Sequence, residues 1–519
     1  MRFIQQHARI LIFLVLSVYL FKAAVNDSDL VAAGDGMEYV LMTEALYNHG
    51  TPDVRLTDIR KYRHESEKYG DWKAQINHGF IDDLYAQIHA GKANYRDNLY
   101  GFAKSKNGQY VSIHFFTYPL FILPIKYVLR PFHIHPIKVF FIANALFIFA
   151  VLYVVFFFFP FKEWINISIG LFYYFSTINW YFLWVHPEIM VCSLIFLSLF
   201  IFQYSNKPYL ALFLGAIAAT QYQPLTILIF IMAIHTVWKN KFQWKSLIRV
   251  GLATCMVLAP AVYYYSHFEV TNMVKYLGFL DTKYITSTRI IGFFTDLNQG
   301  LIISFPLLFI VYLLLLILDW YTRIKRKAIQ FHIYDLIPVL LIGLLMILTT
   351  MGNWNHGQSI NNRYVTYIGT LMLCHFLILS LRWIHVRSIL IILALTLVTQ
   401  VVTIQYFGGP KAKYWTEGKH KKLAEKVLNR YPQFYNPDPW IFMARTAGFQ
   451  HESYYYKGVV YRDVNQTFKK AIIHKEHLDQ VSITELADVK LDELVADKND
   501  QYGWVYIDYM DLPNAVDKN

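Results

Sequence analysis

A succession of apolar runs, each near the length that a bilayer core requires, is the feature that most constrains this sequence. Hydrophobic residues make up 55% of the chain and charged residues only 16%, which is more apolar surface than one soluble core can bury. We therefore expect a mainly α-helical, polytopic transmembrane bundle of about eleven spans. The expected spans are 10–25, 136–159, 164–184, 188–204, 208–222, 224–238, 246–266, 299–321, 333–350, 364–381 and 387–406.

The basic residues predict how this bundle is oriented. The formal net charge is +12, but the positive residues form short clusters between apolar runs, which favours cytoplasmic loops over a nucleic-acid partner. If the N-terminus is inside, these clusters all lie in cytoplasmic loops only if residues 112–130 do not make a single crossing. Pro119 and Pro124 interrupt that stretch, so we expect a bent juxtamembrane or re-entrant segment. The C-terminus is then expected outside.

Two domains are expected. Residues 1–406 would form the transmembrane domain, and residues 26–130 within it a large first extracytoplasmic loop. Residues 407–519 are more polar and begin with Gly408-Gly409-Pro410, so we expect a small extracytoplasmic α+β domain there. The patterns predict loop helices at Met37 to Asn48 and Phe80 to Ala90, C-terminal helices at Lys419 to Leu428 and Thr484 to Val495, and C-terminal strands at Tyr454 to Val464 and Tyr502 to Tyr509.

Cysteine usage and short motifs exclude several classes of site. Cys192, Cys255 and Cys374 lie in apolar runs without C-x-x-C spacing, which predicts neither a disulfide framework nor a zinc site. The sequence also lacks a Walker loop and the GxSxG and HExxH motifs. Any chemistry therefore has to come from other polar groups.

Three polar segments, distant along the chain, fall on the expected outer face. They are residues 34–39 (Gly-Asp-Gly-Met-Glu-Tyr), 186–188 (His-Pro-Glu) and 352–364. Asp35 and Glu188 are the candidate catalytic residues, because carboxylates at the edge of a membrane can act as bases and are costly there without a function. A structural alternative stays open for each. Asp35 with Glu38 resembles a helix N-cap pair, and Glu188 could cap the helix that it begins.

Cationic and aromatic residues near these segments are candidates for substrate binding. Arg363 offers a planar donor fork that suits phosphate, although it could instead be an interfacial anchor. Trp354 could belong to an interfacial aromatic belt, and His114 and His356 could be ordinary loop residues. The loop of residues 268–298 offers further charge for an anionic ligand, at Lys275, Lys283 and Arg289.

As an ordered set, these motifs resemble the bacterial members of the GT-C superfamily, the multi-spanning glycosyltransferases that include protein O-mannosyltransferases and the aminoarabinose transferases of lipid A. The resemblance rests on Gly-Asp-Gly after the first span, on the apolar, proline-containing run from Ser112 to Pro124, and on Glu188 in the second outer loop. The segment from Trp354 to Tyr364 is similar to the W-x-x-G-x-S-x-x-x-R-Y pattern of some bacterial members. Protein mannosyltransferases carry an adjacent acidic pair at the first motif, whereas here glycine follows a single acidic residue.

The resemblance implies a glycosyltransferase of the bacterial inner (cytoplasmic) membrane that acts on the extracytoplasmic side, among membrane lipids. The donor would be a sugar on a polyprenyl phosphate, the acceptor a glycan, lipid or protein, and transfer would invert the anomeric carbon. Asp35 would be the general base, Glu188 would orient the acceptor or share the proton, and Arg363 would bind the phosphate. Further substrate-binding residues would be Glu38, Tyr39, His114, His186, Trp354, His356 and Tyr364.

No cofactor is implied. A divalent metal between Asp35 and Glu188 stays open, but no D-x-D cluster requires one. Three other functions also stay open. A transporter or flippase for a lipid-linked glycan has many spans too, but its charges usually lie at the midplane. A glycan polymerase or ligase would use the same donor. A non-catalytic scaffold would leave Asp35, Glu188 and Arg363 far apart, whereas a transferase requires them to meet at one cavity.

Overall fold

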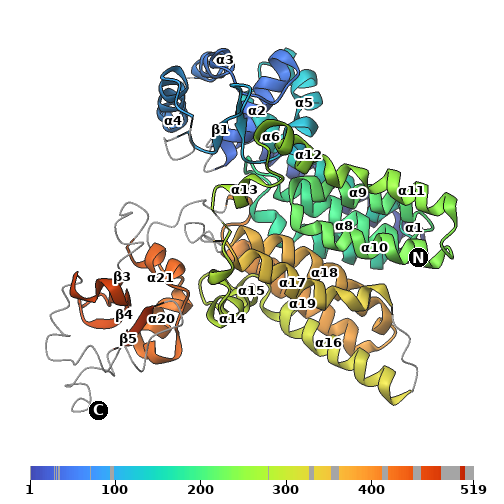
Figure 1. Cartoon of the computed structure of the whole chain (residues 1–519). Helices are drawn as coiled ribbons and strands as arrows, with labels where there is room; N and C mark the ends of the chain where they lie inside the picture. Colours follow the sequence, from blue (N-terminus) through green and yellow to red (C-terminus); the bar gives the residue numbers. More distant parts are fainter. Residues whose placement is uncertain are drawn as a thin grey trace, which may run out of the picture.

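The computed structural model describes residues 2–27, 30, 32, 35–69, 72–93, 99–278, 280–326, 332–351, 362–411, 419–447, 458–480 and 503–508. This part of the chain is mainly helical, with a small antiparallel sheet near the C-terminus (Figure 1). The expected helix at Thr484 to Val495 and the candidate residues Trp354 and His356 lie outside the described residues.

Six helices of the described part are long and apolar enough to cross a membrane, as in a multi-pass membrane protein. Their exposed surfaces are themselves apolar, for example at Leu14 and Val18 of the first helix and Leu395 of the last, and a bilayer would cover such surfaces. The six are α1 (Arg2–Asn26), α6 (Pro136–Phe158), α11 (Trp244–Thr254) continued through η5 (Cys255–Leu258) into α12 (Ala259–Phe268), α16 (Pro306–Lys325), α18 (Arg363–Trp383) and α19 (Arg387–Tyr406).

Several apolar runs form helices shorter than a crossing, so not every run becomes a helix of bilayer length. The run expected as a span at 164–184 does not form one continuous helix, because the helix there ends at Tyr174. Ser176 Oγ and Asn179 Nδ2 donate to carbonyl groups of the last helical turn, which replaces further helical bonds. The shorter elements are α7 (Glu163–Tyr174), η3 (Thr177–Trp180), α8 (Glu188–Tyr204), α9 (Pro208–Gln221), η4 (Gln223–Leu225), α10 (Thr226–Lys239), η7 (Ile333–Leu336) and α17 (Ile337–Thr349).

Helix α18 is the most enclosed of the long helices. It packs against α8, α16 and α17, and 94% of its most apolar stretch is buried, compared with 28% for α1 and 22% for α19. The first residue of α18, Arg363, is therefore held inside the protein and not at a lipid-facing surface.

The first loop folds into a mainly helical layer at one end of the bundle (Figure 1). Both predicted loop helices are present, whereas α3 was not predicted. The short strands β1 and β2 pair antiparallel. Helix α5 has 13 residues with Pro124 inside it, too few for a crossing, which agrees with the expectation for residues 112–130. The elements are α2 (Gly36–His49), α3 (Leu56–Glu67), α4 (Trp72–His89), β1 (Phe102–Lys104), β2 (Tyr110–Ser112), α5 (Thr117–Leu129) and η2 (Arg130–Phe132).

The C-terminal part contains two helices and a three-stranded antiparallel sheet in the order β3-β4-β5. The prediction of α20, β3 and β5 is confirmed within a few residues, but β4 and α21 were not predicted. A separate hydrophobic cluster, including Leu428, Phe442 and Ile472, holds these elements together. They are η8 (Gly409–Lys411), α20 (Lys422–Arg430), η9 (Pro432–Phe434), α21 (Pro439–Thr446), β3 (Gly458–Arg462), β4 (Phe468–His474), η11 (Lys475–Gln480) and β5 (Trp504–Asp508).

The segment between α12 and α16 lies against both the bundle and the C-terminal part. It contains α13 (Met273–Tyr276), η6 (Thr282–Tyr284), α14 (Ser287–Thr295) and α15 (Leu301–Ser304). Leu280 of this segment forms an antiparallel bridge with Met351, directly after α17. We refer to residues 269–305 as the connecting segment.

Candidate functional site

Asp35 lies directly before α2, and its side chain does not cap that helix. Its backbone is already helical (φ −63°, ψ −10°), and it makes no side-chain capping hydrogen bond. The N-cap alternative for Asp35 is therefore not supported. Gly36 lets the start of α2 approach the loop before α8 closely. A Cβ at this position would lie only 3.2 Å from the carbonyl oxygen of Val185 in that loop.

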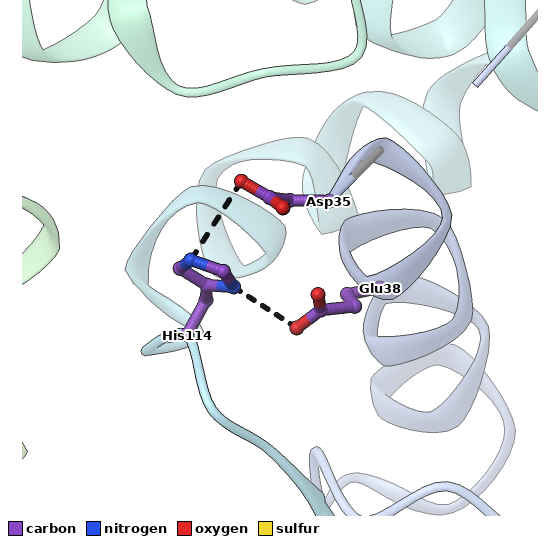
Figure 2. A group of neighbouring side chains, drawn as sticks. All are labelled: Asp35, Glu38 and His114. Carbon is purple, nitrogen blue, oxygen red and sulfur yellow. Dashed lines mark hydrogen bonds and ion pairs between the residues drawn. The ribbon is translucent and has the colours of Figure 1, made fainter. Parts of the chain in front are cut away.

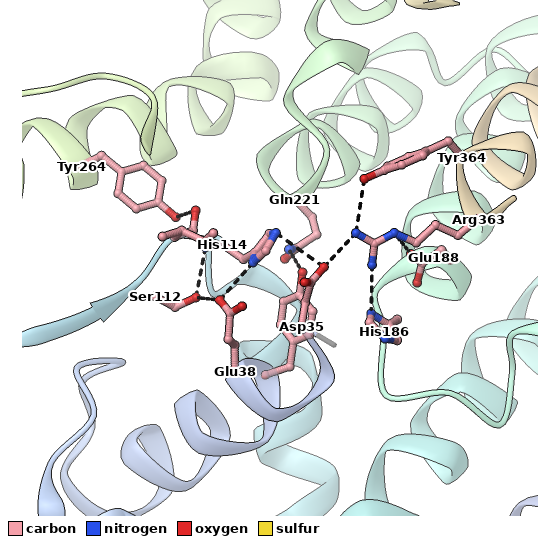
Figure 3. Close-up of polar contacts among 12 residues, drawn as sticks. Asp35, Glu38, Ser112, His114, His186, Glu188, Gln221, Tyr264, Arg363 and Tyr364 are labelled. Atoms are coloured by element: carbon pink, nitrogen blue, oxygen red, sulfur yellow. Dashed lines mark hydrogen bonds and ion pairs between the residues drawn. The ribbon is translucent and has the colours of Figure 1, made fainter. Parts of the chain in front are cut away.

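Arg363 joins the two candidate catalytic residues. Its Nη2 donates to Asp35 Oδ2 at 2.8 Å, and its Nε lies 3.9 Å from Glu188 Oε1 (Figure 3). The three residues begin or precede α2, α8 and α18, which are far apart in the sequence. The expectation that they meet at one place agrees with this geometry.

Glu188 is the first residue of α8 and is buried, with 2% of its surface exposed. No capping hydrogen bond of the preceding residue accounts for this helix end, and Glu188 Oε2 has no hydrogen-bond partner among the described residues. The Arg363 guanidinium is the cation beside it. A buried carboxylate beside a guanidinium favours the functional reading of Glu188 over a purely capping role.

Two further predicted residues complete the surroundings of the guanidinium. His186 Nδ1 lies 3.5 Å from Arg363 Nη1, and the Tyr364 hydroxyl accepts a bond of 3.3 Å from Nη2. The side chain of Asn362 caps α18 by accepting from the Tyr364 amide at 2.9 Å. This cap fixes the start of the helix from which Arg363 projects.

Glu38 and His114 form a second polar pair on the other side of Asp35. His114 Nδ1 lies 3.0 Å from Glu38 Oε2, and its Nε2 lies 3.7 Å from Asp35 Oδ2 (Figure 2). Ser112 Oγ donates to the same Glu38 oxygen at 2.6 Å. Glu38 thus points to the strand-to-helix turn and not back to the start of α2, so the N-cap pair is excluded for Glu38 as well.

The charges of this pair keep a proton at the site. Burial raises the pKa of Glu38, against the attraction of His114. Burial alone would lower the pKa of His114, but the carboxylates of Glu38 and Asp35 outweigh it and raise the pKa to about 9. At neutral pH the Glu38–His114 pair therefore holds a proton close to Asp35.

Asp35, Glu38 and His114 could also hold a metal ion, because one ligand atom of each lies within 4.8 Å of the others. This set differs from the expected pair of Asp35 and Glu188. Those two carboxylates both face Arg363 instead, so a guanidinium occupies the position of a cation between them.

The remaining predicted residue, Tyr39, lies between the two polar groups. Its ring is 5.8 Å from that of His114 and 6.2 Å from that of His186. Gln221 Nε2 donates to its hydroxyl at 3.4 Å. Gln221 was not predicted, although a polar Gln-Tyr-Gln turn between two apolar runs was a usable signal. Tyr367, another wall residue, was not predicted because it lies within an apolar run.

One cavity with a volume of about 380 Å³ is lined by most of these residues, but not by Glu38 or His186. Asp35, Glu188 and Arg363 contribute polar atoms to its wall, together with His114 and Gln221. Another part of the wall is apolar and comes from Ile227, Val274, Leu280, Ile347, Leu348 and Met351. The cavity can therefore receive a ligand with an anionic or hydroxylated head and an apolar tail.

Not all predicted charges belong to this cavity. Lys275, Lys283 and Arg289 do not line it, and Arg289 forms an ion pair with Asp438 of the C-terminal part at 3.0 Å. These three residues therefore contribute no side chain to the wall of this cavity. Compared with known proteins, the chain matches no protein-family model, no curated protein and no solved structure.

Proposed function

We propose that this protein is a membrane glycosyltransferase of the GT-C type, which transfers a sugar from a polyprenyl phosphate to an acceptor outside the bacterial cytoplasmic membrane. The observation that carries the proposal is the meeting of Asp35, Glu188 and Arg363 at one cavity with polar and apolar walls. A transferase for a lipid-linked sugar needs such a combination, because its donor carries a phosphate between a sugar and a hydrocarbon chain.

The electrostatics of the cavity suit the phosphate of the donor. Arg363 and the protonated His114 are two cationic groups on its wall. Residues at the starts of α2, α8 and α18 also line it, and the N-terminus of a helix favours an anionic group. A polyprenyl phosphate that leaves without protonation would be stabilised here.

Asp35 is the proposed general base. A quarter of its side chain is exposed, so an acceptor hydroxyl can reach it, and the Arg363 guanidinium pairs with it at 2.8 Å. The acceptor oxygen forms a bond to the anomeric carbon, the bond from that carbon to the phosphate oxygen breaks, and the hydroxyl proton passes to Asp35. Glu188 has the role of a positioning residue that holds the Arg363 guanidinium.

The apolar part of the cavity wall is the proposed entrance for the prenyl chain. Ile227 begins α10, and Ile347 and Leu348 end α17, both apolar helices. An isoprenoid chain would replace water along this surface, with a gain of about 25 cal/mol per Å² of apolar area. The finer topology, with about eleven crossings and an extracytoplasmic C-terminus, belongs to this proposal.

The proposal is tested by comparing the masses of surface glycans from cells with and without the protein. We expect one sugar residue to be missing when the protein is absent. Wild type and Glu67→Gln, an exposed carboxylate on α3 of the same loop, should restore it, whereas Asp35→Asn should not. Identical glycans with and without the protein would overturn the proposal.

A further inference from the structure

A second cavity lies where the connecting segment meets the C-terminal part. Its volume is about 350 Å³, within the range of small-molecule sites. One wall comes from η6 and α14, and the other from α21, β4, η11 and β5. None of its lining residues lines the cavity around Asp35.

Aromatic rings form much of this wall. Tyr284, Trp440, Trp504 and Tyr506 line the cavity, three of them from the C-terminal part. The His474 ring stands edge-on to Trp504, with ring centroids 5.2 Å apart. Flat rings with a polar edge suit sugar rings, which have apolar C–H faces and hydroxyl groups around their rims.

The charges on the wall are balanced. Arg289 and Asp438 form a buried ion pair, with 5% and 1% of their surfaces exposed. Lys283 pairs with Asp281 at 3.1 Å, and Glu476 adds a further negative charge at the rim. Among the described residues, the wall of this cavity therefore has no surplus of cations for a phosphate.

Polar side chains that can form hydrogen bonds with hydroxyl groups of a ligand also line the cavity. Thr288, His474 and His477 line the cavity, and Nδ1 of His477 is buried without a hydrogen-bond partner among the described residues. A hydroxyl-rich ligand can donate to or accept from such groups.

Arg289, which lines this cavity, is hydrogen-bonded to the wall of the first cavity. Arg289 Nη1 donates to the carbonyl oxygens of Thr349 at 3.2 Å and Met351 at 2.9 Å. Met351 and its bridge partner Leu280 line the cavity around Asp35. A chain-like ligand in the second cavity would thus lie next to the wall of the first.

We propose that this second cavity binds an oligosaccharide, as the part of the acceptor glycan beyond the reacting hydroxyl. The acceptor role rests on the proposed function, but saccharide binding does not. The aromatic walls hold the sugar rings, the threonine and histidine side chains bond their hydroxyl groups, and the buried Arg289–Asp438 pair keeps the two walls in place.

The test is retention of full-length protein, in detergent micelles, on an array of immobilised oligosaccharides of defined sequence. Thr288→Trp places an indole in the cavity, and Thr295→Trp is its control, because Thr295 is exposed on the same helix and does not line the cavity. Wild type and Thr295→Trp should retain the same glycans, and Thr288→Trp should lose at least tenfold in signal. If Thr288→Trp does not elute as a folded species, Tyr284→Ala, which removes one aromatic wall, should show the same loss.

Retention of no glycan by wild type, or equal retention by the cavity variant, would overturn the saccharide site. Sugar transfer and glycan retention are measured on the same preparations, which separates this proposal from the transferase. Glycan binding without any sugar transfer would refute the transferase alone. Sugar transfer without glycan retention would refute only the second cavity.

Discussion

Arg363 is a buried guanidinium with carboxylates on two sides, Asp35 at 2.8 Å and Glu188 at 3.9 Å. Removing a guanidinium from water is costly, and the two carboxylates offset that cost only while both are ionised. On the far side of Asp35, His114 takes a similar place between two carboxylates. The polar groups of the site therefore alternate between carboxylates and cationic groups.

His114 makes protein stability depend on pH. Its pKa is raised to about 9 in the folded protein, against about 6.5 for a free histidine. The protonated ring therefore stabilises the fold fully below about pH 6.5, and this stabilisation is lost as the pH rises through about 9. Melting temperatures measured from pH 6 to 10 should fall more steeply for wild type than for His114→Gln. Parallel curves would contradict the assigned charge.

Some of these residues could be predicted from the sequence, and others could not. Asp35, Glu188 and Arg363 were identified because charges at the ends of apolar runs are rare and costly. The contact of Glu38 with His114 joins residues separated by 76 positions, and no local pattern contains it. For the same reason, the sequence suggested a helix cap for Glu38, which the three-dimensional contact excludes.

At the scale of elements, a close approach between a turn and a helix holds Glu38 in place. Gly101, just before β1, has a φ of +89°, and a Cβ there would overlap the Glu38 carboxylate. Helix boundaries with local causes were predictable, as for α2 and α19. The end of α7 at Tyr174 was not, because the run continues to be apolar and polar side chains of the next turn end the helix.

Substituting Gly101 should disturb the site through this contact. Gly101→Ala combines strain at a positive φ with the overlap on Glu38, and we expect a loss of about 1–3 kcal/mol in unfolding free energy. Gly50→Ala is the matched control, since Gly50 ends α2 with a φ of +76° and nothing lies within 4 Å of its Cβ position. Denaturant unfolding of both variants measures the difference. Equal losses would show that the contact with Glu38 has no effect.

At the scale of the whole molecule, the chain places its polar cavity where the first loop, the bundle and the connecting segment meet. The hydrophobic runs predicted the multi-pass architecture, because membrane length and composition are local properties. The sequence could not show that the C-terminal part contacts the connecting segment, since the Arg289–Asp438 pair joins residues 149 positions apart. The second cavity depends on that contact.

The proposed topology predicts which positions face outward. In a Cys255→Ala background, Phe132→Cys in the α5–α6 connection should react with a membrane-impermeant maleimide on intact cells. Arg326→Cys, in the basic cluster that follows α16, should react only after permeabilisation. Labelling of Arg326→Cys but not of Phe132→Cys on intact cells would reverse the orientation.

The central claim is that the cavity around Asp35 transfers sugars, and one rate tests it most directly. Purified protein in liposomes receives polyprenyl-phosphate-linked sugar and an envelope extract as acceptor, and the initial rate of sugar transfer is measured. We predict that Asp35→Asn lowers this rate at least about 100-fold, with an unchanged melting profile and with Glu67→Gln at the wild-type rate. A wild-type rate in Asp35→Asn would contradict the account.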